Sequence, residues 1–249
     1  MKLKQLFETS IDEFTREMLI KQIRQFQELG FFGRWTLRRD GIVDIDGDVD
    51  LHGGLKRFYG QELPFKFGKV TGNFYAHSNH ELRSLKNFPD EVGKHFSIAQ
   101  CKMLTSLKGC PKKVGGVFIA SYIPGLIEIE EFPDEIGDAV TFAGCSLKSL
   151  EGLPRFLPAD LDVSFNDLTS FKGAPREIGG SLYAHRNRIE TLEGCPREIG
   201  NHFYVQQNRL TNFKGSPRYV GGNFVATDNP IKDTTITTNV IGELFHDHN

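Results

Sequence analysis

Prolines recur along this chain at nearly constant intervals, and this period constrains the fold more than any other feature of the sequence. One set is separated by 22, 22, 21, 21, 21 and 21 residues: Pro89, Pro111, Pro133, Pro154, Pro175, Pro196 and Pro217. A fixed period of about 20 to 50 residues is typical of repeat proteins, in which each unit packs mainly against its neighbours. We therefore expect a repeat solenoid.

Each unit contains the residues of a short strand followed by a turn. The segments PREIGGSLYAHRNRIETLEGC, PREIGNHFYVQQNRLTNFKGS and PRFLPADLDVSFNDLTSFKGA share the skeleton L-x-h-x-x-N-x-L-x-x-L, in which h is a smaller apolar residue. Alternate strand residues point to opposite faces, so Leu182 and Ala184 are expected to point inward. The expected strands begin at Phe74, Phe96, Phe118, Val140, Leu161, Leu182, Phe203 and Phe224. With a weaker first coil at Val49 and Leu51, this pattern predicts about nine coils.

The fifth residue after each strand start is most often asparagine. This position is occupied by Asn79, Cys101, Ile123, Cys145, Asn166, Asn187, Asn208 and Asn229. An inward asparagine can bond the backbone of adjacent coils where the chain turns, whereas Ile123 cannot, so we expect a distortion or a binding feature at that coil. The skeleton resembles the leucine-rich repeat, and the resemblance implies a strand-dominated solenoid with its strands on a concave face.

A second resemblance concerns origin. The phrases DIDGDVDL, LPFKFGKVTGNF and LKGCPKKVGGVF resemble repeat proteins of large tailed bacteriophages over residues 41–231. This implies synthesis in an infected bacterium. The segment LPRFLPADLDVSFNDLTSF is similar to the repeats of bacterial effectors, some of which carry a ubiquitin-ligase domain after the solenoid. No such domain follows in this sequence, so only the recognition half of that architecture is expected.

The two ends depart from the repeat, which predicts three regions. Residues 1–40 are expected to form an N-terminal cap, with a helix over 10–29 that starts at Ser10 and stops at Gly30. This helix could alternatively dock a partner through its apolar stripe. Residues 41–231 are expected to be the solenoid, and 232–249 a C-terminal cap with a short helix starting at Thr237 or Thr238.

Composition narrows the classes of function. The 30 Lys and Arg nearly cancel the 32 Asp and Glu, so there is no overall charge that would favour nucleic acid or an anionic membrane. No apolar run approaches the ~20 residues that span a bilayer, and no secretory signal is recognisable. The four cysteines form no CxxC pair and fit structural positions of the repeat. We therefore expect a protein of the bacterial cytoplasm, without metal or cofactor.

The segment GIVDIDGDVDL carries alternating aspartates that superficially suggest a calcium loop. Counting Asp44 as the first position, the twelfth is Leu55 instead of the required glutamate, and Gly47 falls at the fourth instead of the sixth. We therefore interpret it as a strand with an acidic exposed side.

The outward strand positions and the residue after them supply the candidate binding face. Tyrosine, phenylalanine, histidine and arginine are concentrated there, a composition typical of protein interfaces. The predicted partner-binding residues are Tyr75, Tyr122, Phe165, Tyr183, His185, Arg186 and Tyr204.

A hydrolase is the enzymatic alternative, because Ser164 and His185 occupy the same column on adjacent strands and Asp162 is nearby. No nucleophile elbow or glycine-rich oxyanion loop surrounds Ser164, so no catalytic residue is predicted. The sequence favours a non-enzymatic protein-binding protein, which engages a host or phage protein. The alternatives are a structural component of the virion and, less well supported, a glycan-binding protein.

Overall fold

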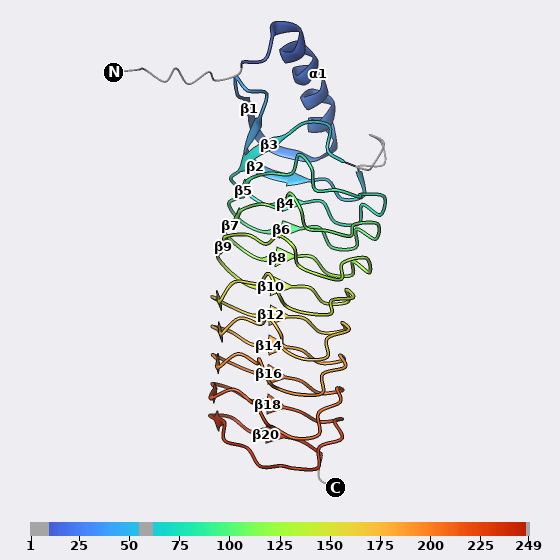
Figure 1. The fold of residues 1–249 in the computed structure, drawn as a ribbon. Coiled ribbons are helices and arrows are strands. Elements are labelled where there is room, and N and C mark those ends of the chain that lie inside the picture. Colours follow the sequence, from blue (N-terminus) through green and yellow to red (C-terminus); the bar gives the residue numbers. More distant parts are fainter. Residues whose placement is uncertain (1–9, 55–61, 248–249) are drawn as a thin grey trace, which may run out of the picture.

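The computed structural model describes residues 10–54 and 62–247, and the chain forms a parallel β-solenoid of stacked coils with one helix at its N-terminal end (Figure 1). The helix, α1 (Glu13–Gly30), leads into β1 (Phe31–Leu37), which pairs antiparallel with β2 (Val43–Asp50). Along β2, the first half pairs with β3 (Phe67–Val70) and the second half with β4 (Phe74–Tyr75), both parallel. Thus β2 is the first coil of the stack.

The helix begins later than the sequence predicted. The backbone N–H of Thr15 donates to Asp12 Oδ1 at 2.8 Å, which makes Asp12 the N-cap in place of Ser10. Its apolar side reaches the core through Ile23 and Phe26, which are fully buried. The helix ends at Gly30 as predicted, where a Cβ would overlap with the carbonyl oxygen of Asp50.

One long ladder of parallel strands runs the length of the stack, and we call it the main ladder. After β4 its strands are β6 (Phe96–Ser97), β8 (Phe118–Ile119), β10 (Val140–Thr141), β12 (Leu161–Asp162), β14 (Leu182–Tyr183), β16 (Phe203–Tyr204), β18 (Phe224–Val225) and β20 (Leu244–Phe245). From β4 to β18, every strand starts at the residue that the sequence predicted. The solenoid of about nine coils is therefore confirmed.

Each coil contributes a second short strand, two to three residues after its proline, and these form the edge ladder. It has two parts, because β9 does not pair with β11. The first part is β3, β5 (Glu91–Val92), β7 (Lys113–Val114) and β9 (Glu135–Ile136); the second is β11 (Phe156–Leu157), β13 (Glu177–Ile178), β15 (Glu198–Ile199), β17 (Tyr219–Val220) and β19 (Asn239–Val240). Glycine follows most of these strands because the coils approach closely there. A Cβ on Gly200 would overlap with the carbonyl oxygen of Gly179.

Backbone hydrogen bonds join neighbouring coils all around the circumference. On the main ladder Leu182 N–H donates to His202 O at 2.8 Å, and on the return segment Arg209 N–H donates to Ile189 O at 2.9 Å. Both sides of a coil are therefore held at about the same spacing of ~4.8 Å. In Figure 1 the coils form a straight column, and the bend of a horseshoe is not seen. We call the outward side of the main ladder the strand face.

The core is a continuous stack of aromatic and aliphatic side chains. The rings of Phe96 and Phe118 stack at 5.3 Å between centroids, and those of Phe203 and Phe224 at 4.7 Å; all four side chains are fully buried. Each ring packs against the next coil, so each coil depends on its neighbours for a completed core.

The corner after each main-ladder strand is held by the predicted inward residue. Asn208 Nδ2 donates to Ala184 O of the preceding coil and to Val205 O of its own, both at 3.0 Å, and its Oδ1 accepts from Ile189 N–H at 2.9 Å. The cysteines replace only the donor: Cys145 Sγ donates to Ala120 O at 3.1 Å. Asparagine therefore holds the corner in both directions, and cysteine in one.

The predicted C-terminal helix is wrong. In its place β19 and β20 extend both ladders by another coil, with Val240 opposite Val220 and Leu244 opposite Phe224. The proline that marks the other units is replaced by Thr237, two residues before β19, and this last unit is one residue shorter, because Tyr219 pairs with Asn239. The solenoid thus continues past residue 231, through the described residues.

Candidate binding site on the strand face

The repeat places three side chains of every coil on or beside the strand face. In the coil of β14, Leu182 and Ala184 are buried, while Tyr183 and His185, which alternate with them, are partly exposed. The next residue, Arg186, has a φ of 55° and is left-handed. The equivalent residues of the other coils are also left-handed: Ser78, Gln100, Tyr122, Gly144, Phe165, Gln207 and Asp228. The residue after the outward strand positions, which the sequence pattern included in the candidate face, therefore belongs to the turn.

Such a backbone is strained for any residue other than glycine, by roughly 1 kcal/mol or more. The inward asparagine that follows bonds the surrounding backbone and holds the turn in place. The held turn therefore fixes the direction in which the side chain at this position leaves the backbone. The Phe165 side chain, for example, is 45% exposed.

Five of the predicted residues lie on the consecutive coils of β12, β14 and β16 in two contacting groups, which together we call the aromatic cluster: Phe165, Tyr183, His185, Arg186 and Tyr204. The rings of Tyr183 and Tyr204 stack at 5.1 Å between centroids and 13° between planes. The Arg186 Cζ atom lies 4.9 Å from the centroid of the Phe165 ring, and His185 meets the same ring edge-on at 5.3 Å. Arg186 Nε also donates to Gln207 Oε1, which fixes the guanidinium.

Two polar atoms beside this cluster lack a hydrogen-bond partner within the described part of the chain. They are Nδ1 of His185 and Oε1 of Gln206, both buried. Burial lowers the pKa of His185, an effect that Asp162 opposes and Arg186 reinforces. The imidazole is therefore predominantly neutral at pH 7. Buried polar groups without partners are uncommon in folded proteins.

Tyr75 and Tyr122 lie outside the cluster. Tyr75 is on β4, four strand intervals or about 19 Å from β12. Burial, followed by the charges of Asp48 and Asp50, raises the pKa of its phenol. The ring of Tyr122 covers Gly144 of the next coil, where a Cβ would lie 2.6 Å from the ring. The structure thus groups five of the seven predicted residues and separates two.

The arrangement of Ser164 differs from that of a catalytic serine. Its Oγ donates to Asp162 Oδ1 at 2.6 Å, and the same carboxylate oxygen accepts the Ser164 N–H at 2.9 Å. A catalytic serine instead donates to the histidine, which the aspartate orients from its other side. Here the aspartate holds the serine directly, and the serine side chain is buried.

Comparison of the chain with protein-family models, curated protein sequences and solved structures returned no match. Within the described residues, no helix is both long enough and apolar enough to cross a bilayer.

The cysteines occupy the apolar positions that the repeat gives them. Burial raises the pKa of the Cys101 and Cys145 thiols to about 11, and that of Cys110 to about 12. The pKa of Cys195 is also raised by burial. All four thiols are therefore protonated at neutral pH and are weak nucleophiles.

The acidic segment near the N-terminus forms β2, as expected from its alternation. Its carboxylates bond the adjoining segments: Asp44 forms a bidentate pair with Arg38, and Asp48 Oδ1 accepts the Asn73 N–H at 2.6 Å. Among residues 10–54 and 62–247, no group of three or more His, Cys, Asp or Glu side chains is arranged to hold a metal ion.

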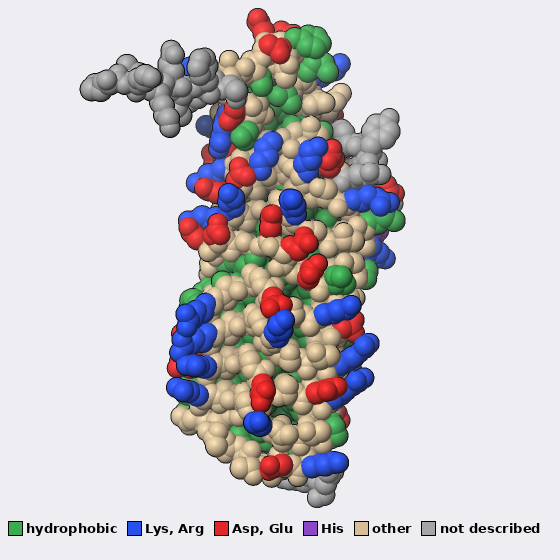
Figure 2. Space-filling model, viewed as in Figure 1, with side chains coloured by type: hydrophobic (Ala, Val, Ile, Leu, Met, Phe, Trp, Pro, Cys, Tyr) green, Lys and Arg blue, Asp and Glu red, His purple; other side chains and the backbone are tan. Residues whose placement is uncertain are grey.

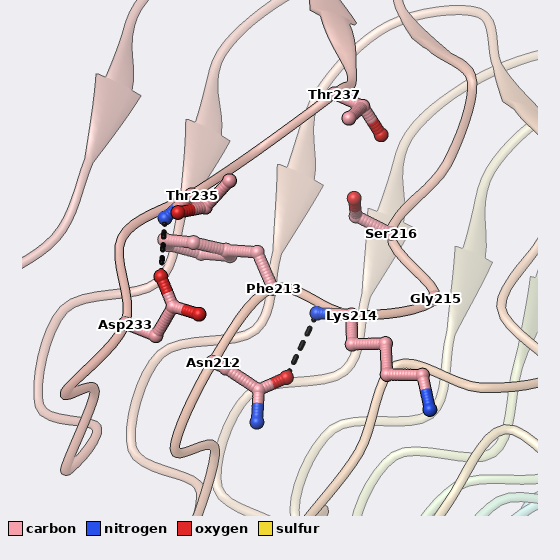
Figure 3. A pocket seen from close by; sticks show the side chains of 8 residues that line it. All are labelled: Asn212, Phe213, Lys214, Gly215, Ser216, Asp233, Thr235 and Thr237. Carbon is pink, nitrogen blue, oxygen red and sulfur yellow. Dashed lines mark hydrogen bonds between the residues drawn. The ribbon is translucent and has the colours of Figure 1, made fainter.

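A recess that the sequence did not predict lies between the last two return segments (Figure 3). It has a volume of about 570 Å³ and is lined by Asn212, Phe213, Lys214, Gly215, Ser216, Asp233, Thr235 and Thr237. It forms where threonines replace the bulkier residues of other units. Asn212 and Asp233 already accept backbone N–H groups, from Lys214 and Thr235, both at 2.9 Å. The departure from the repeat at residues 234–238 was the signal for it.

Proposed function

We propose that this chain is a non-enzymatic protein-binding solenoid whose aromatic cluster contacts a partner protein. One observation supports this proposal best: the stacked pair Tyr183–Tyr204 and the Arg186–Phe165 pair lie on three consecutive coils. Tyrosine and arginine are enriched among the residues that dominate binding energy, because they bury a large area and also donate hydrogen bonds.

The rigidity of the cluster also supports this proposal. The tyrosines lie opposite each other in a parallel ladder, and Arg186 is fixed by Phe165 and Gln207. Side chains that are ordered before binding lose little conformational entropy when a partner arrives. The unsatisfied His185 and Gln206 atoms add polar capacity that a partner can engage when these side chains reorient.

The partner is proposed to be a host or phage protein in the cytoplasm of an infected bacterium. This part rests on the resemblance of residues 41–231 to phage repeat proteins. Neighbouring strands of the main ladder are paired about 4.8 Å apart, so a partner segment that lies along the strand face would contact successive coils at this spacing.

The test is capture from infected and uninfected bacterial lysates, followed by titration of the purified partner. Tyr183→Ala combined with Tyr204→Ala should weaken the partner's affinity by about thirtyfold or more, equivalent to about 2 kcal/mol. Tyr75→Ala is the matched control, because it removes an outward tyrosine of the same ladder outside the cluster. It should change the affinity less than about threefold.

Equal binding by the double variant and the parent would discard the aromatic cluster as the interface. If the chain instead co-purified stoichiometrically with virus particles, and the double variant did so equally well, a structural role in the virion would replace the proposal. Thermal unfolding of both variants would show that a loss of affinity does not come from unfolding.

A further inference from the structure

A column of arginines runs along the edge ladder, separate from the aromatic cluster. Four consecutive units have arginine directly after the repeat proline: Arg155, Arg176, Arg197 and Arg218. The N–H of each of the last three donates to the carbonyl oxygen of the arginine one coil earlier, at 2.8 Å. The four side chains therefore start at intervals of about 4.8 Å. Figure 2 shows Lys and Arg side chains gathered in such a row along one edge of the lower half of the molecule.

No acidic side chain of the described residues pairs with these arginines, whereas several other cations of the same coils are paired. Nearby, Lys172 lies 3.2 Å from Glu151, and Arg188 lies 3.0 Å from Asp167, each pair joining adjacent coils. None of the ion pairs between described residues includes an arginine of the column. In addition, Nε of Arg176 is buried without a hydrogen-bond partner.

Earlier coils avoid this accumulation of like charge. There the same position holds Asp90, Lys112 and Asp134 in turn, so the sign alternates along the axis. Like charges directly opposite each other on neighbouring strands are destabilising. The four stacked arginines therefore oppose folding, which favours a role in binding an anionic partner.

The next column of the edge ladder restricts the class of partner. It consists of Phe156, Glu177, Glu198 and Tyr219, in register with the arginines. The two glutamates beside the central arginines would repel the phosphates of a nucleic acid. The exposed rings, Phe156 at 57% and Tyr219 at 36%, instead offer apolar contacts at both ends. A protein segment with carboxylates, some cations and flanking apolar residues complements both columns.

The spacing restricts the conformation of that segment. Three coil intervals span about 14 Å, and three turns of an α-helix span about 16 Å. An extended strand along the same axis presents same-side residues about every 6.7 Å, or about 20 Å over three intervals. One residue per helical turn can therefore lie within reach of each of the four arginine side chains. In an extended strand the same-side residues are spaced too widely to lie opposite all four. We propose that the arginine column docks an acidic α-helix of a partner protein, aligned with the axis of the solenoid.

The test uses the full chain and two synthetic helical peptides of identical composition. In the first, glutamates at positions i, i+4, i+7 and i+11 form one stripe; in the second, the same glutamates are distributed around the helix. Fluorescence anisotropy at low salt should show the striped peptide binding about tenfold more tightly than the other, with an affinity that falls as salt is added.

The variant Arg176→Gln with Arg197→Gln should reduce binding of the striped peptide by about tenfold or more. Arg188→Gln with Arg209→Gln removes the same charge from two coils on the other side and should leave binding within about twofold. The column variant should also unfold at no lower temperature than the parent, because the substitution relieves repulsion. That result would show that a loss of binding is not a loss of fold.

Three results would overturn the proposal. The first is equal binding of the striped peptide by the parent and the Arg176→Gln, Arg197→Gln variant, and the second is equal binding of the two peptides by the parent. The third is tighter binding of a single-stranded oligonucleotide, lost in the same variant, which would assign the column to nucleic acid. Because the aromatic cluster is intact in both arginine variants, failure here leaves the proposed function standing.

Discussion

The coils of β4 to β10 and the coils of β12 to β18 share the main ladder but hold their corners differently. In the first group, the upper coils, the inward corner residues are Asn79, Cys101, Ile123 and Cys145; in the second, the lower coils, they are Asn166, Asn187, Asn208 and Asn229. The left-handed residue before them has nearly the same φ in both groups, 58° at Tyr122 and 55° at Arg186. The corner shape is therefore set by the stacking of coils, and asparagine adds hydrogen bonds to it.

This comparison also shows where binding chemistry is concentrated. Both the aromatic cluster and the arginine column lie mainly on the lower coils, which have the complete asparagine ladder. At the coil of Ile123 we expected a distortion or a binding feature. Its turn is regular, and β8 pairs with β10 in the common register. The apolar side chain fills the corner without replacing the hydrogen bonds.

The largest effect is expected from removing one asparagine of the lower coils. Asn208→Ala leaves the Ile189 N–H buried without its acceptor, although Ala184 O and Val205 O keep bonds from Asn187 and Asn229. The free energy of unfolding should fall by about 2–3 kcal/mol. Cys145→Ala removes one weak S–H bond and should cause a fall of about 1 kcal/mol. Urea denaturation measures both, and equal losses would contradict the comparison.

A somewhat smaller effect is expected in the order in which the thiols become reactive. Cys101 and Cys145 lie at corners held in one direction only, whereas Cys195 lies in a lower coil between asparagine corners. In moderate urea a thiol-specific reagent should modify the first two about tenfold faster, a difference of about 1.4 kcal/mol in opening free energy. Peptide mapping identifies the sites. Simultaneous modification would instead indicate that all coils open as one unit.

A gain of about 1 kcal/mol in unfolding free energy is expected when an asparagine is placed in the upper coils. Cys145→Asn keeps a donor to Ala120 O and replaces the weak S–H by an amide N–H. Cys145→Ser is the control, because its hydroxyl is shorter than the thiol and the amide and reaches Ala120 O less well. A destabilised asparagine variant would show that packing around the sulfur decides the stability of this corner.

The smallest effect concerns pH and involves one histidine from each group. Burial is the main cause that lowers the pKa of His77 and of His185 from the ordinary value of 6.5. The unfolded chain therefore binds protons more readily, and stability that is present above pH 6.5 is lost as the pH falls toward the lowered values. His52 adds to the lowering at His77, whereas Asp162 opposes it at His185.

Thermal unfolding from about pH 7.5 to 5.5 measures this loss. His77→Gln should flatten the profile more than His185→Gln. At His77 the larger of the two neighbouring charge effects, from His52, lowers the pKa and exceeds the opposing effect of Asp50. At His185 the larger one, from Asp162, raises the pKa and exceeds that of Arg186. The reverse order would contradict the assignment of causes.

Much of the solenoid could be predicted because one period governs both prolines and strands. The beginning of every main-ladder strand from Phe74 to Phe224 followed from that period and from the alternation of apolar residues. The final coil was missed because Thr237 replaces the proline and the threonine-rich segment resembles a cap. Its residues NVIGELF nevertheless keep the apolar spacing of the unit.

The candidate sites were predicted less completely. The sequence pattern does not give the turn geometry, and the net charge of the whole chain conceals a local group of like charges. Alternation placed Tyr183 and Tyr204 on one face, and register brought them into contact. Alternation could not show that Phe165 and Arg186 occupy a left-handed turn. The arginine column was hidden by the overall charge of −2, although its period of 21 residues is visible in the sequence.

The uniform spacing around every coil makes the length of this protein adjustable in whole units. Deleting residues 182–202 would join Ser181 to Phe203 and place β16 where β14 lies now, between β12 and β18. The column would become about 4.8 Å shorter, and the backbone ladders would continue across the junction. Duplicating the same segment would lengthen it equally. The number of units thus sets the length of the binding surface, and duplication or loss of units can match that length to the dimensions of a partner.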